Sequence, residues 1–277
     1  MKGLIIAAGY GTRFLPFTKT IPKEMIPLID KPSIAFIVEE FIASGIRDII
    51  IITSRRKKAL EDYFDREIEL ETVFKARNET KKLKAIEAYK ANFCFIRQSE
   101  MLGAGHALLL AKEAIGDNPC VVAYPDDIHF GDKPLSARMI DIYKKSSCCV
   151  LAAVHNPPNL NRYGVLKLAP DNYHVEEIIE KPEPGKEPSK EATIGRYVYT
   201  PEFFEELENG WKKHETGEYY HTYALNKLMA KNKVVYCQVE GKRLDTGEPE
   251  GYLNAVIEYA KRDPALLKVL KESLKDI

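Results

Sequence analysis

The chain has 277 residues, enough for one large domain or two modest ones at about 150 residues each, so size does not exclude an enzyme. Lysine and arginine together number 41, as do aspartate and glutamate, and the formal net charge is zero. This balance argues against a protein whose whole surface attracts nucleic acid or a membrane, but it leaves room for a local basic pocket that binds a phosphorylated ligand. The 16 glycines and 16 prolines are too few for a low-complexity or fibrous chain.

The cysteines and the first apolar run indicate a cytoplasmic protein. The five cysteines are odd in number, show no CxxC spacing and mostly stand in apolar runs. We therefore predict reduced, buried thiols at Cys94, Cys120, Cys148, Cys149 and Cys237. The run GLIIAA is shorter than a signal-peptide core and far shorter than a membrane span, so no membrane anchor is expected.

The first half of the chain alternates between two kinds of segment. Short runs rich in isoleucine and valine predict strands buried on both faces at 3–8, 48–53, 93–97, 120–124 and 148–154. Apolar residues at helical spacing predict helices at 33–45, 103–116 and 135–146. This alternation predicts an α/β domain with a largely parallel sheet. The run at 55–90, dense in both signs of charge, is interpreted as a solvated helical excursion.

The second half is more mixed. Strands broken by proline-rich loops are predicted at 163–169, 174–181 and 192–200. A final helical stretch at 249–274 is interrupted before Pro264, because proline cannot continue a helix from the preceding turn.

A glycine-rich turn directly after the first strand points to a phosphate ligand. Residues 7–24 read AAGYGTRFLPFTKTIPKE, and the backbone N–H groups around Gly9 and Gly11 can cradle phosphates at a strand end. The loop also carries Arg13, whose guanidinium fork suits phosphate oxygens, and Lys23, a mobile point charge. The alternative is a turn that merely bears surface cations.

Two common nucleotide-binding patterns are excluded. In a dinucleotide-binding fold a third glycine would stand where this chain has Phe14, and an isolated acidic residue would follow about 20 residues on. The P-loop pattern of Gly-Lys followed by Ser or Thr is also missing. These departures argue against a nicotinamide dehydrogenase.

The same loop, followed by DKPSI, resembles the signature of the sugar-1-phosphate nucleotidyltransferases. The resemblance runs from residue 4 to about 260 and implies a catalytic loop that wraps a nucleoside triphosphate, with Arg13 and Lys23 on its phosphates. It further implies nucleotide contacts at Ala8, Gly9, Gly11, Thr12 and Glu24. The thymidylyltransferase branch usually has glycine where this chain has Ala8 and lacks the charged excursion, so the uridylyl branch fits better.

Carboxylates follow two of the predicted strands. Asp126 and Asp127 come just past the strand at 120–124, and Asp245 is expected at the end of an apolar strand at 234–239. Carboxylates at strand ends can hold magnesium, although an Asp-Asp turn is as often a helix cap or a solvated loop. The family resemblance implies that Asp126 and Asp245 coordinate Mg²⁺ and that Asp127 supports them.

The segment IRQSEMLGAGHALLLAK resembles the family element that reads the nucleobase. The amide of Gln98 can pair with a pyrimidine edge, and Gly103 lets the backbone approach the ring. His106 begins a helix and has no Cys or Ser partner in this motif, so we interpret it as structural rather than catalytic.

Three later elements match the sugar-phosphate side of the family. They are YGV, EKP and GRYV, which place Gly164, Glu180, Lys181 and Gly195. Glu180 would accept hydrogen bonds from sugar hydroxyls, Lys181 would pair with the sugar phosphate, and the glycines would leave room beside the ring. A departure follows, since Tyr220 and Tyr223 stand where the family usually has Gln and Asp, and this leaves the identity of the sugar open.

The resemblance implies a Rossmann-like three-layer α/β fold with a mixed, mostly parallel central sheet. Its expected parts are a catalytic domain over 1–247, with its sugar-phosphate side at 155–247 and a helical insertion at about 56–90, and C-terminal helices at 248–277 that could join subunits of a dimer or tetramer. The implied reaction is magnesium-dependent transfer of UMP from UTP to glucose 1-phosphate. The alternatives are thymidylyl transfer, another sugar 1-phosphate, or a catalytically silent regulatory subunit.

Overall fold

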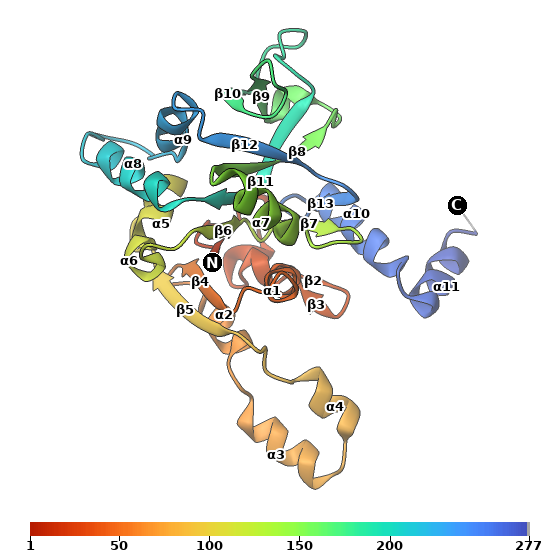
Figure 1. The fold of residues 1–277 in the computed structure, drawn as a ribbon. Helices are drawn as coiled ribbons and strands as arrows, with labels where there is room; N and C mark the ends of the chain where they lie inside the picture. The colour runs from red at the N-terminus through yellow and green to blue at the C-terminus, as the bar shows by residue number, and fades with distance from the viewer. Residues whose placement is uncertain (276–277) are drawn as a thin grey trace.

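A nine-stranded mixed sheet forms the centre of residues 1–275, the part of the chain that this computed structural model describes (Figure 1). Seven strands follow one another in the order β10-β9-β11-β6-β1-β4-β5, and β8 joins β11 to β12. Their bounds are β1 Lys2–Ile6, β4 Asp48–Thr53, β5 Asn92–Arg97, β6 Cys120–Ala123, β8 Cys149–His155, β9 Gly164–Leu168, β10 Val175–Glu180, β11 Glu191–Tyr199 and β12 Val234–Gln238.

Four strands of the central sheet, β1, β4, β5 and β6, form a continuous parallel part. β1 lies between β4 and β6 and is parallel to both, and β5 pairs with β4 on the outer side. Successive side chains of a strand point to opposite faces. Leu4 and Ile5 accordingly enter two different hydrophobic clusters, and both are fully buried. The prediction of strands buried on both faces is therefore confirmed for β1, β4, β6 and β8, but it is wrong for 93–97, because β5 is an edge strand whose residues are half-buried or exposed.

Helices cover both faces and complete a three-layer arrangement. One face is covered by α1 Ser33–Ala43, α7 Leu135–Ser146 and α10 Pro249–Ala260. The other face is covered by α5 Ala104–Leu110, α6 Lys112–Ile115, α8 Pro201–Trp211 and α9 Thr222–Met229. The predicted three-layer α/β fold is confirmed, except that the helix expected at 103–116 is interrupted at Ala111, between α5 and α6.

The long strand β11 makes the sheet mixed. It runs antiparallel to β6, β8 and β9, and it meets β9 at Ala192 and β6 at 196–199. Its register with β8 shifts between Thr193 and Tyr197. β9 and β10 form an antiparallel pair beyond it. Figure 1 shows this pair at the end of the sheet opposite β5, so the predicted nucleotide and sugar-phosphate segments occupy different halves of one continuous sheet.

A separate two-stranded ladder carries the downstream aspartate. β7 (Asp127–Phe130) pairs antiparallel with β13 (Lys242–Asp245), and Asp245 is the partner of Asp127. The prediction that Asp245 ends the strand at 234–239 is therefore wrong, because β12 stops at Gln238 and the chain turns before β13. Gly241 makes this turn at φ +97°, where a Cβ would lie 2.4 Å from the Phe130 carbonyl oxygen.

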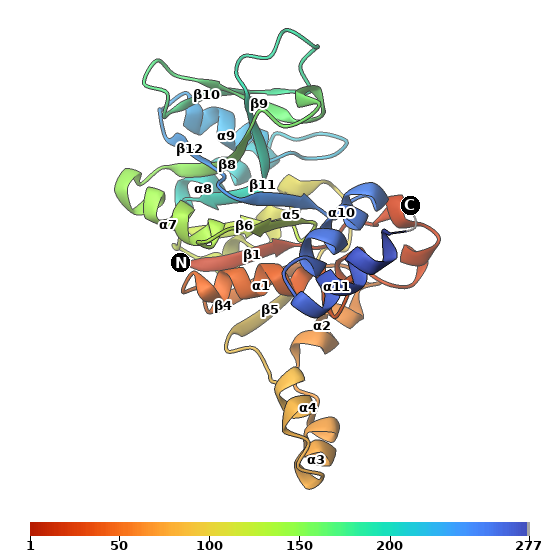
Figure 2. The ribbon, with the colours of Figure 1, turned by 90° about the vertical axis from the view of Figure 1, so that its right-hand side faces the viewer.

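The charged excursion contains three helices with different roles, α2 Lys58–Phe64, α3 Ile68–Ala76 and α4 Thr80–Ala85. α2 packs on the body of the protein through Leu60 and Phe64, which belong to the hydrophobic core. α3 and α4 bury no residue and extend away from the sheet (Figures 1 and 2). The part that projects into solvent is thus shorter than the predicted insertion at about 56–90.

The predicted break before Pro264 is confirmed, since α10 ends at Ala260 and α11 spans Pro264–Ser273. α10 contacts the N-terminal segment, since the Tyr252 hydroxyl donates to the Pro27 carbonyl oxygen at 2.7 Å. α11 follows α10, buries no residue and lies farther from the sheet (Figure 1). The last two residues of the predicted segment at 248–277 lie outside the described residues, and its role in joining subunits stays a prediction. Within residues 1–275, no helix is both long and apolar enough to cross a bilayer.

The cysteines agree with the prediction at four of five positions. All five lie in the described part of the chain and none forms a disulfide. Cys94 is exposed, contrary to the prediction of a buried thiol. Its strand, β5, lies at the edge of the sheet, where one side of the strand lacks a neighbour.

Candidate active site

The loop after β1 is a compact turn held by its own hydrogen bonds. Gly11 adopts φ +70°, a left-handed conformation that favours glycine, and begins a 3₁₀ turn at Thr12–Phe14. The Thr18 hydroxyl donates to the Gly11 carbonyl oxygen at 2.7 Å. Phe14 packs edge-on against Tyr252 of α10, with ring centroids 6.0 Å apart. These contacts fix the loop at the carboxyl end of β1, where Arg13 is exposed toward solvent.

A buried ion pair lies beneath this loop. The Lys57 ammonium donates to both carboxylate oxygens of Glu24, at 2.7 and 2.8 Å, and to the Ala7 carbonyl oxygen. Glu24 is 1% exposed and Lys57 5%. The nucleotide contact of Glu24 stays a prediction. Because its carboxylate binds Lys57 inside the protein, Glu24 would affect a ligand by positioning the loop.

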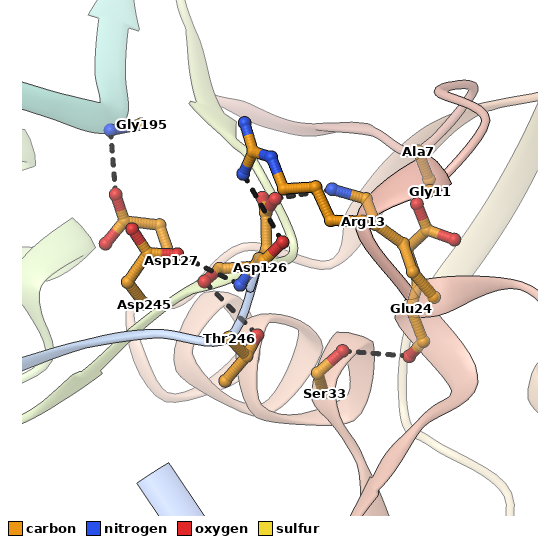
Figure 3. Close-up of polar contacts among 12 residues, drawn as sticks. Ala7, Gly11, Arg13, Glu24, Ser33, Asp126, Asp127, Gly195, Asp245 and Thr246 are labelled. Atoms are coloured by element: carbon orange, nitrogen blue, oxygen red, sulfur yellow. Dashed lines mark hydrogen bonds and ion pairs between the residues drawn. The ribbon is translucent and has the colours of Figure 1, made fainter. Parts of the chain in front are cut away.

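The Asp126 and Asp245 side chains converge on one point, next to Gly247. A Cβ on Gly247 would lie 2.9 Å from Asp126 Oδ2, 3.0 Å from Asp245 Oδ1 and 3.2 Å from Arg13 Nη1. Figure 3 shows the Arg13 guanidinium above the Asp126 side chain. Segments far apart in the sequence thus place two carboxylates and a cation around Gly247, where a larger side chain would contact all three.

Backbone hydrogen bonds hold this convergence in place. The Thr246 N–H donates to the Asp126 carbonyl oxygen at 2.7 Å, and the Gly247 N–H donates to Asp245 Oδ1 at 2.9 Å (Figure 3). Arg13 Nη1 donates to the Gly247 carbonyl oxygen at 3.3 Å. The turn after β13 is therefore tied to both the loop and the segment after β6.

Lys23 is ion-paired with Asp126 in this structure. Burial alone would lower the pKa of Lys23, but the charges of Asp126 and Glu24 outweigh it and the pKa rises. Burial alone would likewise raise the pKa of Asp126, yet the Lys23 ammonium outweighs it and the pKa falls. At neutral pH both groups are therefore charged, and Lys23 stands within reach of the point where the carboxylates meet.

Asp127 does not face this point. Arg243 donates to both of its carboxylate oxygens, at 2.9 and 3.2 Å, and the Gly195 N–H donates to Oδ2 at 3.0 Å. Arg196, 1% exposed, donates to the Asp127 carbonyl oxygen at 3.1 Å from below. With its oxygens engaged by these donors, Asp127 can support the carboxylate pair but has little capacity left for a metal ion.

Asp126 and Asp245 keep more acceptor capacity for a magnesium ion than Asp127. Asp127 accepts three hydrogen bonds, whereas Asp245 accepts one at each oxygen, from the Gly247 N–H and from Arg243 at 3.3 Å, and Asp126 Oδ2 accepts from Lys23. Mg²⁺ is usually held by one or two protein carboxylates, with water and substrate phosphates completing an octahedron. Among residues 1–275, no cluster of three or more His, Cys, Asp or Glu side chains could enclose a metal by itself. Two carboxylates beside the glycine-rich loop are therefore suited to a metal whose coordination a phosphorylated substrate completes.

The predicted base-reading residues lie together at the end of β5. Gln98 is 4% exposed and its amide nitrogen donates to the Gly103 carbonyl oxygen at 3.2 Å. Gly103 has φ +93°, and a Cβ there would lie 2.7 Å from the Tyr219 carbonyl oxygen. Gly103 is therefore needed for the close packing of the backbone around Tyr219, whereas its approach to a nucleobase ring stays a prediction.

The predicted sugar-side residues form a second group on β9 and β10. Gly164 and Glu180 are register partners, and a Cβ on Gly164 would lie 3.0 Å from Glu180 Oε1. Lys181 follows directly, is exposed, and donates through its backbone N–H to the Tyr163 carbonyl oxygen at 2.9 Å. The Tyr163 hydroxyl accepts from Arg243 at 3.3 Å. This chain of contacts connects the sugar-side strands with the carboxylates.

The two tyrosines that depart from the family pattern are placed differently. Tyr220 is exposed, and its hydroxyl donates to Glu218 at 2.7 Å. Tyr223 is half-buried and packs against the second hydrophobic cluster, on the face covered by α8. Tyr223 therefore has a packing role, whereas Tyr220 is free to meet a ligand or a partner.

Three charged residues of the site were missed at the sequence level. Arg243 carries a usable signal, since it stands two residues before Asp245 in a strand and residues at this spacing share a face. Arg196 and Lys57 carry none. Each is a single cation whose burial depends on which segments the fold brings over it.

The sequence of the whole chain is similar to proteins of one family. The family described as "Nucleotidyl transferase" matches residues 2–262. A curated relative named UTP–glucose-1-phosphate uridylyltransferase, from Staphylococcus epidermidis, is 40% identical over 282 residues that cover 100% of this chain and 98% of the relative.

Solved structures agree with this match. The structure described as UTP-bound UGPase from Acinetobacter baumannii is 33% identical, covers 99% of both chains and superimposes with a TM-score of 0.90. A UDP-glucose pyrophosphorylase complexed with UDP-glucose is 36% identical, covers 95% of this chain and 100% of the other, and has a TM-score of 0.80. Sequence and fold agree, and the chain belongs to the nucleotidyl transferase family.

Proposed function

We propose that this protein transfers UMP from UTP to glucose 1-phosphate, with Mg²⁺, and releases UDP-glucose and pyrophosphate. The observation that carries the proposal is the convergence of Asp126, Asp245 and Arg13 beside Gly247, with Lys23 on Asp126. Such a set of charges suits the meeting of two phosphorylated substrates. The names of the relatives favour UTP and UDP-glucose as nucleotide and product.

The reaction requires no general base. An oxygen of the sugar phosphate attacks the α-phosphorus of UTP, the new P–O bond forms, and the bond to the bridging oxygen breaks as pyrophosphate leaves. A phosphate monoester with a second pKa of about 6 is mostly a dianion at neutral pH, so the attacking oxygen is already unprotonated. The protein must therefore align the two anions and offset their repulsion.

Each charged residue has a distinct part in that alignment. Arg13, held by the Gly247 carbonyl, presents its remaining N–H groups toward the triphosphate. When phosphate oxygens enter, the Lys23 ammonium binds them in place of Asp126 or together with it, because this ammonium is a mobile point charge. Lys181 approaches from β10 and holds the sugar phosphate. A magnesium ion on Asp126 and Asp245 would supply positive charge between the phosphates.

A substrate panel tests this proposal directly. The purified protein is incubated with Mg²⁺, one of several nucleoside triphosphates and one of several sugar 1-phosphates, and pyrophosphate release is measured. We expect release to be fastest with UTP and glucose 1-phosphate. Fastest release with dTTP or with another sugar 1-phosphate would replace the proposed specificity. No release with any pair would favour the silent regulatory subunit.

Replacing Lys181 by alanine separates the two substrate sites. We expect the apparent KM for glucose 1-phosphate to rise about tenfold or more, in line with the loss of one charge-assisted hydrogen bond, while that for UTP changes little. Lys186→Ala is the matched control, because Lys186 is exposed and pairs only with Glu183 among the described residues. A larger effect on UTP would move Lys181 to the triphosphate side.

A further inference from the structure

His106 contacts the residue that is expected to read the nucleobase. Its Nδ1 lies 3.1 Å from Gln98 Nε2, and the same nitrogen of Gln98 lies 3.2 Å from the Gly103 carbonyl oxygen. A carbonyl oxygen only accepts, so the Gln98 atom next to Gly103 must be the amide nitrogen rather than its oxygen. His106 Nδ1 then faces a donor and must be the unprotonated nitrogen of a neutral ring, with the hydrogen on Nε2.

These two contacts use the full donor capacity of Gln98. A side-chain amide carries two N–H bonds, and here one points to Gly103 and the other to His106. No residue within 1–275 donates to the remaining oxygen, Oε1. Gln98 therefore offers a ligand an acceptor and no donor.

The His106 ring is itself held in place. It packs on Trp211 of α8, with centroids 5.1 Å apart and planes inclined by 34°. The N–H of the preceding residue, Gly105, donates to the Tyr219 carbonyl oxygen at 2.8 Å. Burial lowers the pKa of His106, although Glu100 partly opposes this. The ring is thus both oriented and neutral at physiological pH.

We propose that His106 is a positioning residue for base selection, which fixes the Gln98 amide so that its oxygen alone meets the nucleobase. An acceptor at this place suits the N3–H of uracil or thymine, whereas cytosine presents a lone pair at N3 and would be repelled. Without the His106 acceptor, the Gly103 carbonyl alone opposes rotation of the amide, so the rotated form that offers a donor costs less free energy. The inference rests on the proposed function, because it concerns how the same site distinguishes UTP from CTP.

Two substitutions separate the acceptor from the ring. His106→Phe keeps an aromatic ring on Trp211 but has no acceptor, and His106→Asn lacks the ring but places an amide oxygen close to the position of Nδ1. For each protein, kcat/KM is measured with UTP and with CTP, together with the KM for glucose 1-phosphate. We expect His106→Phe to lower the UTP/CTP ratio of kcat/KM about tenfold, which is the effect of losing one hydrogen bond. The KM for glucose 1-phosphate should not change. His106→Asn should retain most of the ratio.

The outcomes are distinguishable. A wild-type protein that releases no pyrophosphate from UTP contradicts the proposed function. If the wild type prefers UTP and His106→Phe keeps the full preference, or if both variants lose it equally, the role of His106 is overturned.

A measurement on the wild-type protein does not depend on the folding of any variant. The ¹⁵N NMR signals of the His106 ring, assigned by their absence in His106→Asn, report which nitrogen carries the hydrogen. We expect an unprotonated Nδ1 and a protonated Nε2 at neutral pH. The opposite tautomer would overturn the inference.

Discussion

Replacing Asp126 by asparagine is expected to lower kcat by about 100-fold or more, the size of a loss of several kcal/mol in transition-state stabilisation. Asp126 faces the same point as Asp245 and is also the ion-pair partner of Lys23. The variant therefore removes one of two carboxylates for a metal ion and leaves Lys23 without its anion. Steady-state pyrophosphate release at saturating UTP and glucose 1-phosphate measures the effect.

The magnesium dependence of the variant separates these two consequences. If Asp126 is a metal ligand, the variant should show both a lower kcat and a higher half-saturating Mg²⁺ concentration. Asp132→Asn is the matched control, because Asp132 is exposed just after β7 and undergoes the same change of charge. Near-normal turnover of Asp126→Asn at saturating Mg²⁺ would refute the metal assignment.

Replacing Lys57 by methionine should have the largest effect on stability. The substitution leaves the Glu24 carboxylate, 1% exposed, without its partner. Removing one member of a buried ion pair costs about 3 to 5 kcal/mol, because the other charge stays buried and uncompensated. We expect the free energy of unfolding, measured in urea, to fall by this amount. Lys58→Met, at the exposed neighbouring position, should change it by less than about 0.5 kcal/mol.

A double-mutant cycle tests the cause of that loss. When Glu24→Gln is added to Lys57→Met, the buried charge is removed, and a substantial part of the lost stability should return. Additive losses in the double variant would mean that the two residues act independently and that the ion pair is not what stabilises the loop. Activity measured in parallel would show how far the position of this loop matters to the nucleotide.

The order of strands and helices is largely predictable from the sequence, because periodicity reports which side chains are buried. The run DIIIIT at 48–53 has no polar face and becomes β4, buried on both sides. The place of Asp245 is not predictable in this way. It depends on the turn at Gly241 and on pairing between β13 and β7, more than a hundred residues apart in the chain.

In the candidate site, too, some residues can be predicted from the sequence and others cannot. The loop with Arg13 and Lys23 is recognisable because its residues are contiguous and lie at a strand end. Lys57 is not, since it stands within a run of charges whose other members are mostly exposed, and only the fold shows that it lies under the loop. Local patterns therefore identify residues that face the ligand better than those that support them from within.

The hydrogen bonds from Arg243 through Tyr163 to Lys181 also affect which residues of this site can change during evolution. Arg243 reaches Tyr163 through a side chain, but Tyr163 reaches Lys181 through backbone atoms alone. A backbone hydrogen bond survives a change of side chain, so the residue at 181 and its neighbours on β10 can be exchanged without breaking the connection. The strands proposed to bind the sugar phosphate can thus change their side chains while the segments proposed to bind the triphosphate keep their architecture.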